Sequence, residues 1–461
     1  MEFLTSLKAV IDALGAVILL PVIIFLVAIA MGANVGRAFR AGVTIGIAFI
    51  GINLVIGLMW TNLSAVGQAM VDNLKIQRDV VDVGWPSAAA IAFGSNVGLW
   101  VIPIAILVNI VLLLARLTKT LNIDIWNYWH FAFIGSMVVV VTGNLALGLI
   151  AAAIAAAFAL FLGDWTAKAA QSFYNLPGIS IPHLTTAPSV PFAIVTNWII
   201  DRIPGLRDLN ADPETIRKRF GVWGEPVILG LVIGLILGIL GFYNAGDLTT
   251  VLVKVLGTGM NLAAVMLLLP RMVQILMEGL IPVSEAAREF MQKRAAGRDI
   301  YIGLDSAILI GHPAAISTSL VLVPIAILLS IILPGNRVIL FADLAVIPFV
   351  VALFAPLMRG NIVRMIIAGI LELGVGFYLA TAMSPVFTQA AQGAGFQMPE
   401  GALQITSIAD GFLWPYWFFS TLTGLMGGIV GLIVVAALLG VVWFFYMKNQ
   451  KAWERAAGAP A

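Results

Sequence analysis

Long apolar runs follow one another along most of this 461-residue chain, and short polar segments separate them. A helix needs about 20 mainly apolar residues to cross the roughly 30 Å of hydrocarbon in a bilayer. Such runs form two groups of five and a last single run: 14–31, 43–60, 97–115, 126–142 and 145–163, then 226–244, 251–280, 314–333, 340–357 and 361–383, and finally 417–446. The pattern predicts an all-α integral membrane protein with about eleven transmembrane helices.

Between these runs lie mixed or polar segments that fit neither a span nor a water-facing loop, at 84–96, 164–200, 303–313 and 384–415. The clearest is 175–191, which reads Asn-Leu-Pro-Gly-Ile-Ser-Ile-Pro-His-Leu-Thr-Thr-Ala-Pro-Ser-Val-Pro. Its prolines break any long helix. Irregular backbone is tolerated at membrane depth only where it is buried in protein or lines a cavity. We therefore expect re-entrant hairpins that contribute to a translocation site.

The two groups of five runs resemble each other in order. Gly51-Ile-Asn53-Leu54 matches Gly259-Met-Asn261-Leu262, and Pro103-Ile-Ala-Ile-Leu107 recurs as Pro324-Ile-Ala-Ile-Leu328. Because five spans is an odd number, the second copy would be inverted in the membrane, which is typical of transporters. We expect one membrane unit, 1–461, with a first repeat at 1–200, a cytoplasmic basic loop at 201–225, a second inverted repeat at 226–415, and a last span and tail at 416–461.

The amino-acid composition also indicates an integral membrane protein. Apolar residues make up 61% of it and charged residues only 10%, whereas soluble domains carry roughly 25% charged residues. The absence of cysteine excludes disulfides, cysteine-ligated metals and a thiol nucleophile. The formal charge of +2 is spread over short loops and gives no reason to expect nucleic acid as a partner.

Basic residues indicate the orientation. With eleven spans and a cytoplasmic C-terminal tail, every Lys and Arg lies inside except Lys8, Lys75, Arg78, Lys254 and Arg337. We therefore expect a multi-pass membrane protein with its C-terminus in the cytoplasm. The loop 201–225, which contains Arg217-Lys218-Arg219, serves either as a docking face for a soluble partner or only as a positive-inside anchor.

Ionisable residues inside a membrane are costly and point to function. His130 and Asn127 lie one helical turn apart beside Trp126 and Trp129, which suits a polyhydroxylated ligand or, alternatively, an interfacial aromatic belt. Each remaining candidate could instead have a structural role. His183 could be a turn histidine, Asp305 a helix cap, and Glu372 a buried, hydrogen-bonded brace rather than a proton site. His312 stands between Gly311 and Pro313, where a helix must break. We expect no metal site and no cofactor, because three isolated histidines without cysteine make a poor metal cage.

Several motifs together resemble one family. They are Val83-Gly84-Trp85-Pro86, Asn122-Ile-Asp-Ile-Trp-Asn-Tyr-Trp-His130-Phe131, Leu176-Pro-Gly-Ile-Ser-Ile-Pro-His183, Gly311-His312-Pro313 and Pro334-Gly-Asn-Arg337. The chain resembles the galactitol-type enzyme IIC of the bacterial phosphoenolpyruvate-dependent phosphotransferase system, which is related to the ascorbate-type enzyme IIC.

This resemblance implies eleven spans in two inverted repeats with re-entrant hairpins, a homodimer, and an elevator-type carrier. It also implies a separate enzyme IIB, which carries a phosphocysteine, and an enzyme IIA. By motif and order His130, His183 and Asp305 match the substrate contacts of the ascorbate relatives. We add Trp85, Asn127 and His312 as candidate substrate-binding residues, with His183 or Asp305 as the general base.

Three functions of different classes follow, the last of which is an orphan scaffold or channel. The first is a sugar-alcohol permease subunit, for galactitol, that couples translocation to phosphorylation by the partner chain; the phosphoryl donor would then lie outside this chain. The alternative is a proton-coupled secondary transporter of a polyol or sugar, with Asp305 or Glu372 as proton sites.

Overall fold

The structure of the chain is a computed structural model, which describes residues 21–22, 24–26, 28–30, 32–74, 79–124, 127–209, 211–220, 225–294, 299–340, 342–399 and 402–460. Much of the predicted span 14–31, residues 221–224 of the basic loop and Trp126 lie outside these residues.

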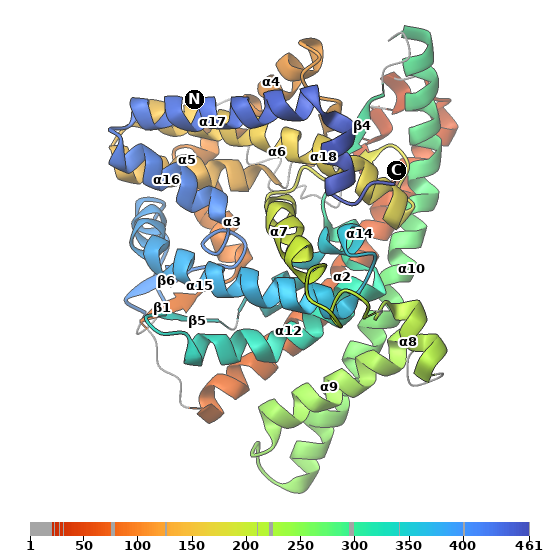
Figure 1. The fold of residues 1–461 in the computed structure, drawn as a ribbon, viewed down its shortest axis with the longest axis vertical. Coiled ribbons are helices and arrows are strands. Elements are labelled where there is room, and N and C mark those ends of the chain that lie inside the picture. The colour runs from red at the N-terminus through yellow and green to blue at the C-terminus, as the bar shows by residue number, and fades with distance from the viewer. Residues whose placement is uncertain are drawn as a thin grey trace.

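Helices make up most of the described chain (Figure 1). They are α2 (Val35–Leu74), α3 (Trp85–Gly94), α4 (Gly98–Leu114), α5 (Tyr128–Thr142), α6 (Leu145–Tyr174), α7 (Val190–Ile200), α8 (Pro213–Phe220), α9 (Pro226–Phe242), α10 (Leu248–Arg294), α11 (Ala307–Ile310), α12 (Pro313–Ile332), α13 (Ile347–Val351), α14 (Phe354–Leu357), α15 (Ile362–Gly393), α16 (Trp414–Leu425), α17 (Ile429–Lys448) and α18 (Gln450–Ala456). The short strands are β1 (Val80–Asp82), β2 (Thr120–Asn122), β3 (Ile179–Ser180), β4 (Tyr301–Gly303), β5 (Val338–Ile339) and β6 (Gln404–Thr406).

Among the described residues, 6 helices are long and apolar enough to cross a membrane, all or part of α2, α6, α10, α12, α15 and α17. The pair α3 and α4, bent by 90° at their break, would make a seventh span. Three shorter apolar helices, at Tyr128–Thr142, Ala187–Ile200 and Val227–Phe242, accompany them. The prediction of a helical multi-pass membrane protein is confirmed, while the number of eleven spans stays a prediction.

Two of the predicted spans are not single helices. The run 340–357 is divided into a 3₁₀ turn, α13 and α14, and its prolines, Pro348 and Pro356, lack the N–H that a continuous helix needs. The run 417–446 is divided between α16 and α17, because Gly427 and Gly428 adopt positive φ angles of 75° and 61°. Both runs were predicted from apolar composition, which cannot show a break of this kind.

The strands, which the apolar pattern had not predicted, form two small parallel sheets in the orders β5-β1-β6 and β2-β4-β3. In each sheet the central strand comes from one half of the chain and both flanking strands from the other half. Ile302 of β4, for example, lies between Leu121 of β2 and Ile179 of β3. Gly303 allows this close approach, since a Cβ there would lie 2.9 Å from side-chain atoms of Thr120 and Pro182.

At both open edges of the β2-β4-β3 sheet, side chains of neighbouring helices form hydrogen bonds with the backbone groups that have no strand partner. Asn109 of α4 accepts a hydrogen bond from Asn122 N (2.9 Å) and donates one to Thr120 O (2.8 Å), so that both outward-facing groups of β2 are satisfied. On the other edge, Gln171 of α6 donates to Ile179 O (2.9 Å). Buried backbone groups without partners would each be costly. Two helix amides therefore make these strands stable in an apolar surrounding.

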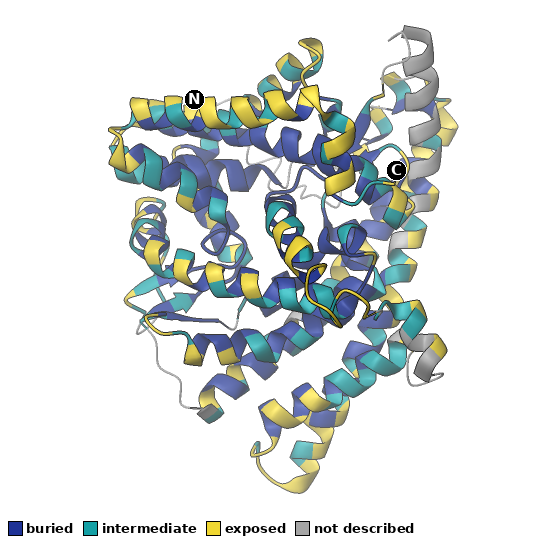
Figure 2. Cartoon of the chain, viewed as in Figure 1, coloured by how far each residue is buried: buried dark blue, intermediate teal, exposed yellow. Residues whose placement is uncertain are grey.

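The long helices form a body beside the sheets. Helix α10 packs along α9 and α2, and the α9–α10 hairpin protrudes from the rest of the molecule (Figure 1). The helices meet closely at glycines: a Cβ on Gly234 would lie 2.8 Å from Gly259 Cα, and one on Gly238 2.9 Å from Val255 Cα. Buried residues concentrate away from this hairpin (Figure 2). Helix α5, for instance, is buried at every position from Tyr128 to Val138, as expected of a helix that is apolar on all sides.

We expect Asn109→Leu to destabilise the protein, because leucine preserves the volume but leaves two buried groups of β2 without partners. Each unpaired group costs about 1–3 kcal/mol, so the midpoint of thermal unfolding in detergent should fall clearly. The control is Ile110→Leu, since Ile110 is 46% exposed on the same helix and makes no side-chain hydrogen bond. Equal stability of the two variants would contradict a structural role for the Asn109 amide.

Candidate functional site

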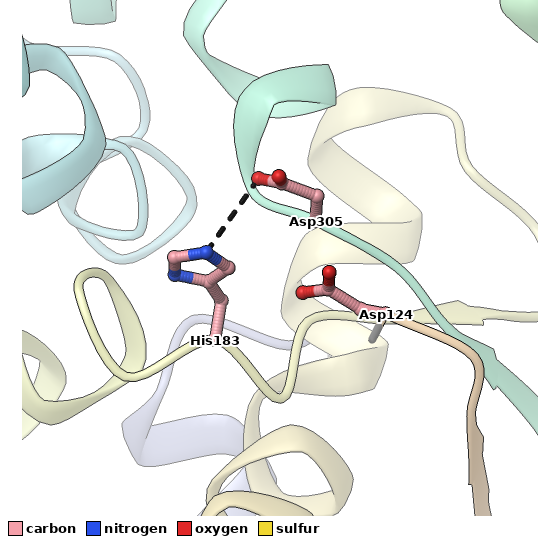
Figure 3. Close-up of side chains that lie close together, drawn as sticks. All are labelled: Asp124, His183 and Asp305. Atoms are coloured by element: carbon pink, nitrogen blue, oxygen red, sulfur yellow. Dashed lines mark ion pairs between the residues drawn. The ribbon is translucent and has the colours of Figure 1, made fainter. Parts of the chain in front are cut away.

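Three polar side chains converge where the strands of the β2-β4-β3 sheet end (Figure 3). Asp124 follows β2, Asp305 follows β4 and His183 follows β3. Because the strands are parallel, their carboxyl ends meet at one edge of the sheet. The sheet thus brings together residues that are far apart in the sequence.

The convergence is tight and mostly buried. One ligand atom from each of Asp124, His183 and Asp305 lies within 4.8 Å of the others. His183 Nε2 is 3.7 Å from Asp305 Oδ1, and their side chains are 8% and 17% exposed. Two carboxylates and one imidazole in this arrangement could bind hydroxyl groups or, by composition alone, a divalent cation.

The backbone holds each of the three side chains in place. Asp305 Oδ1 accepts a hydrogen bond from Ala307 N (2.8 Å), and Asp124 Oδ1 accepts one from Asn127 N (3.2 Å). Thr185 N donates to His183 Nδ1 (3.2 Å). That nitrogen must therefore be the unprotonated one, and the neutral imidazole carries its proton on Nε2, toward Asp305.

Asn127 positions the loop around His183. Its Oδ1 accepts a hydrogen bond from Leu184 N (3.1 Å), and its Nδ2 donates a short one to Pro182 O. The residue is fully buried. Both ends of the amide are used on the two neighbours of His183, so Asn127 acts on the site through the loop.

His130 links the hairpins of the two halves. Its Nε2 lies 2.9 Å from Thr185 Oγ1, and its Nδ1 lies 3.1 Å from Asp410 Oδ1 and within hydrogen-bond distance of the Tyr416 hydroxyl. The ring stacks on Trp129 at 3.8 Å and meets the His183 ring edge to face at 5.1 Å. The His130 and Trp129 rings are thus packed inside the protein. His130 contacts the ring of His183 and the hydroxyl of Thr185.

The remaining two candidates lie elsewhere. Trp85 begins α3, where its backbone N–H donates to Asp343 Oδ1 (2.7 Å) beside the other sheet. His312 accepts a hydrogen bond from Ala314 N (3.2 Å) as the N-cap of α12, and its ring lies 4.7 Å from Phe173 and 5.5 Å from Tyr174. Trp85 thus lies at the other sheet and His312 at the start of α12, whereas the cluster consists of Asp124, His183 and Asp305.

Three residues of this surrounding were not among the candidate site residues named from the sequence. Asp124 accepts the N–H of Asn127 just before α5, and it also lies in the cluster. Asp410 and Tyr416 reach His130 from about 280 residues further along the chain. A buried aspartate in an otherwise apolar segment was the available signal, but nothing in the sequence indicated its partner.

Comparison with known proteins identifies the family of this chain. Residues 9–401 match the family model described as the PTS system sugar-specific permease component. The "PTS system galactitol-specific EIIC component" of Escherichia coli K12 is 41% identical over 382 residues, 83% of each chain, and the protein of that name from strain O157:H7 is equally similar. A "Putative permease IIC component" of Escherichia coli K12 is 37% identical over 441 residues, 95% of this chain and 98% of that protein. The chain therefore belongs to the family of sugar-specific permease components of the phosphotransferase system.

Proposed function

We propose that this chain is the membrane permease subunit for a sugar alcohol, galactitol, whose uptake is coupled to phosphorylation by a separate enzyme IIB. The relatives named galactitol-specific support the substrate. The observation that carries the proposal is the convergence of His183, Asp305 and Asp124 at one sheet edge. The proton-coupled alternative is not favoured, because the similar proteins are phosphotransferase components.

The hydrogen bonding of His183 favours hydroxyl groups over a metal ion as the ligand. A metal-bound histidine offers the lone pair of one ring nitrogen and keeps a proton on the other. Here Nδ1 accepts the Thr185 N–H, so Nε2 carries the proton and acts as a donor. The site thus presents one N–H donor and two carboxylate acceptors. A polyol, whose hydroxyls both donate and accept, satisfies all three.

The same assignment favours Asp305 over His183 as the general base. A polyol hydroxyl held between them would accept a hydrogen bond from His183 Nε2 and donate one to the Asp305 carboxylate. When its oxygen bonds to the phosphorus of the partner's phosphocysteine, the P–S bond breaks, the cysteine leaves as thiolate, and the hydroxyl proton passes to Asp305. The absence of cysteine from this chain agrees with a donor on the partner.

We further propose that the architecture is that of two inverted repeats, 1–200 and 226–415, in an elevator-type carrier. The exchange of strands supports this, since β1 and β4 stand at the centres of two sheets flanked by strands of the opposite half. The body formed by α2, α9 and α10 would make the homodimer contact. Exposed apolar side chains on it, such as Leu54, Val253 and Met260, support such a contact. The C-terminus would lie in the cytoplasm of the bacterial cell, on the side of enzymes IIB and IIA.

The binding site is tested by substitution. His183→Ala removes the donor and Asp305→Asn removes the anionic acceptor, so each should abolish galactitol binding measured by calorimetry, while the oligomeric state stays that of the unmodified protein. Asp208→Asn is the matched control, because Asp208 is 68% exposed in a loop. Retained binding in either site variant would remove that residue from the site. His312→Asn, which keeps an N-cap acceptor for α12, reports whether the His312 imidazole contacts the ligand.

Removal of metal ions separates the two ligand classes. After dialysis against EDTA, we expect the Kd for galactitol to change less than about twofold, because a hydroxyl ligand needs no cation at His183. Addition of Mg²⁺, Mn²⁺ or Zn²⁺ should then change nothing. Loss of binding that one of these ions restores would show that the three residues hold a metal.

Transport in vesicles tests the coupling. Proteoliposomes that contain phosphorylated enzyme IIB should accumulate galactitol phosphate, and an uncoupler should leave this uptake unchanged because phosphorylation drives it. Vesicles without the partner should only equilibrate the polyol. Accumulation of free galactitol under a proton gradient, in the absence of enzyme IIB, would instead identify a secondary transporter.

A further inference from the structure

A cavity of ≈ 580 Å³ lies between the end of α6 and the C-terminal segment, away from the site described above. Helix α18 turns away from the end of α17 and lies against α6 (Figure 1). From α6 and the residues after it the cavity is lined by Lys168, Asn175 and Pro177, and from the C-terminal segment by Lys451, Glu454 and Arg455.

The wall made by the C-terminal segment is firmly docked. Trp165 of α6 donates its indole N–H to Trp453 O (2.7 Å), and the two rings lie 5.2 Å apart. A Cβ on Gly458 would lie 2.7 Å from Leu357 Cα, so the chain end packs directly on the end of α14. The cavity is therefore part of the folded protein and has two defined sides.

The charges around the cavity do not balance. Its carboxylate, Glu454, is 3% exposed and is already paired with Lys168 (3.1 Å) and with the amide of Gln450 (2.7 Å). Lys451 and Arg455 have no ion-pair partner among the described residues. Two exposed cations thus face a space of molecular size, and an anion would neutralise them.

The surroundings of the cavity are those expected at the boundary of a membrane. Helix α17 has 20 residues, which at 1.5 Å per residue is about the 30 Å of a hydrocarbon core. Its last turns expose Phe444 (61%), Phe445 (50%) and Met447 (50%). Lys448, Lys451 and Arg455 follow directly, and the Trp165–Trp453 pair lies beside them. Aromatic and basic residues gather at such boundaries, where lipid headgroups lie.

We propose that this cavity binds the phosphate group of an anionic phospholipid, with Lys451 and Arg455 as its cationic contacts and the exposed face of α17 beside the acyl chains. The lipid would join the C-terminal segment to Pro177, which stands two residues before β3 and six before His183. A bound headgroup would thereby stabilise the base of the hairpin that carries His183.

Thermal unfolding of the full chain tests the proposal. In phosphatidylcholine–detergent micelles we would titrate phosphatidylglycerol, or glycerol 3-phosphate as the soluble phosphate, and follow the rise in Tm, which reports affinity. We expect phosphatidylglycerol to raise Tm. Loss of both cations that line the cavity, in Lys451→Gln with Arg455→Gln, should weaken binding about thirtyfold, if each contact with the headgroup contributes as much as a basic residue near an anionic membrane surface.

Lys448→Gln is the matched control, because Lys448 is basic and belongs to the same chain end but does not line the cavity. It should respond to phosphatidylglycerol as the unmodified protein does. If the double variant fails to fold in phosphatidylcholine, the two single variants carry the test, each with binding weaker by about fivefold.

Each outcome of these titrations either supports or overturns the phosphate site. Equal stabilisation by glycerol 3-phosphate, lost in the same variants, would keep the phosphate site and identify a soluble phosphate as its source. Phosphatidylglycerol that stabilises no more than phosphatidylcholine would overturn the proposal. So would a Lys448→Gln variant that loses as much as the double variant.

Discussion

Backbone hydrogen bonding is the constraint on which the rest of this structure depends. The hairpins that leave the long helices carry extended backbone inside an apolar protein, where each unpaired N–H or C=O is costly. Every such segment finds its partner in the other half of the chain: β1 pairs with β5 and β6, and β4 pairs with β2 and β3. Neither half can therefore complete its own hairpins, and the two halves fold as one unit.

The two sheets carry different chemistry although their pairing is alike. Beside the first sheet, Asp343 accepts hydrogen bonds from Trp85 N, from the Ser407 hydroxyl and from Ile408 N. That carboxylate is fully occupied in joining α3 to the hairpin of the second half. Beside the other sheet, Asp305 accepts the N–H of Ala307 and lies 3.7 Å from His183 Nε2. The same sheet architecture thus supports a structural carboxylate, Asp343, in one case and a candidate binding site, with Asp305, in the other.

His130 connects these two regions. It is fully buried and contacts Thr185 on one side and Asp410 with Tyr416 on the other. Thr185 in turn holds the imidazole of His183 through its backbone N–H. A change in the hairpin of the second half would therefore reach His183 through one histidine and one threonine. In the proposed carrier, this route would keep both hairpins moving as a single body.

The sequence established the class of the protein and singled out four residues, Asn127, His130, His183 and Asp305, that the structure brings into one region. Apolar runs of membrane-spanning length can hardly be anything other than buried or lipid-facing helices, and prolines and histidines stood out because both are costly there. Periodicity could not reveal strands of two or three residues, since such strands are stable only when a distant segment pairs with them. Nor could it show that His312 caps α12 while Asp124 faces His183. Those assignments depend on which chain segments meet, and only the tertiary structure decides that.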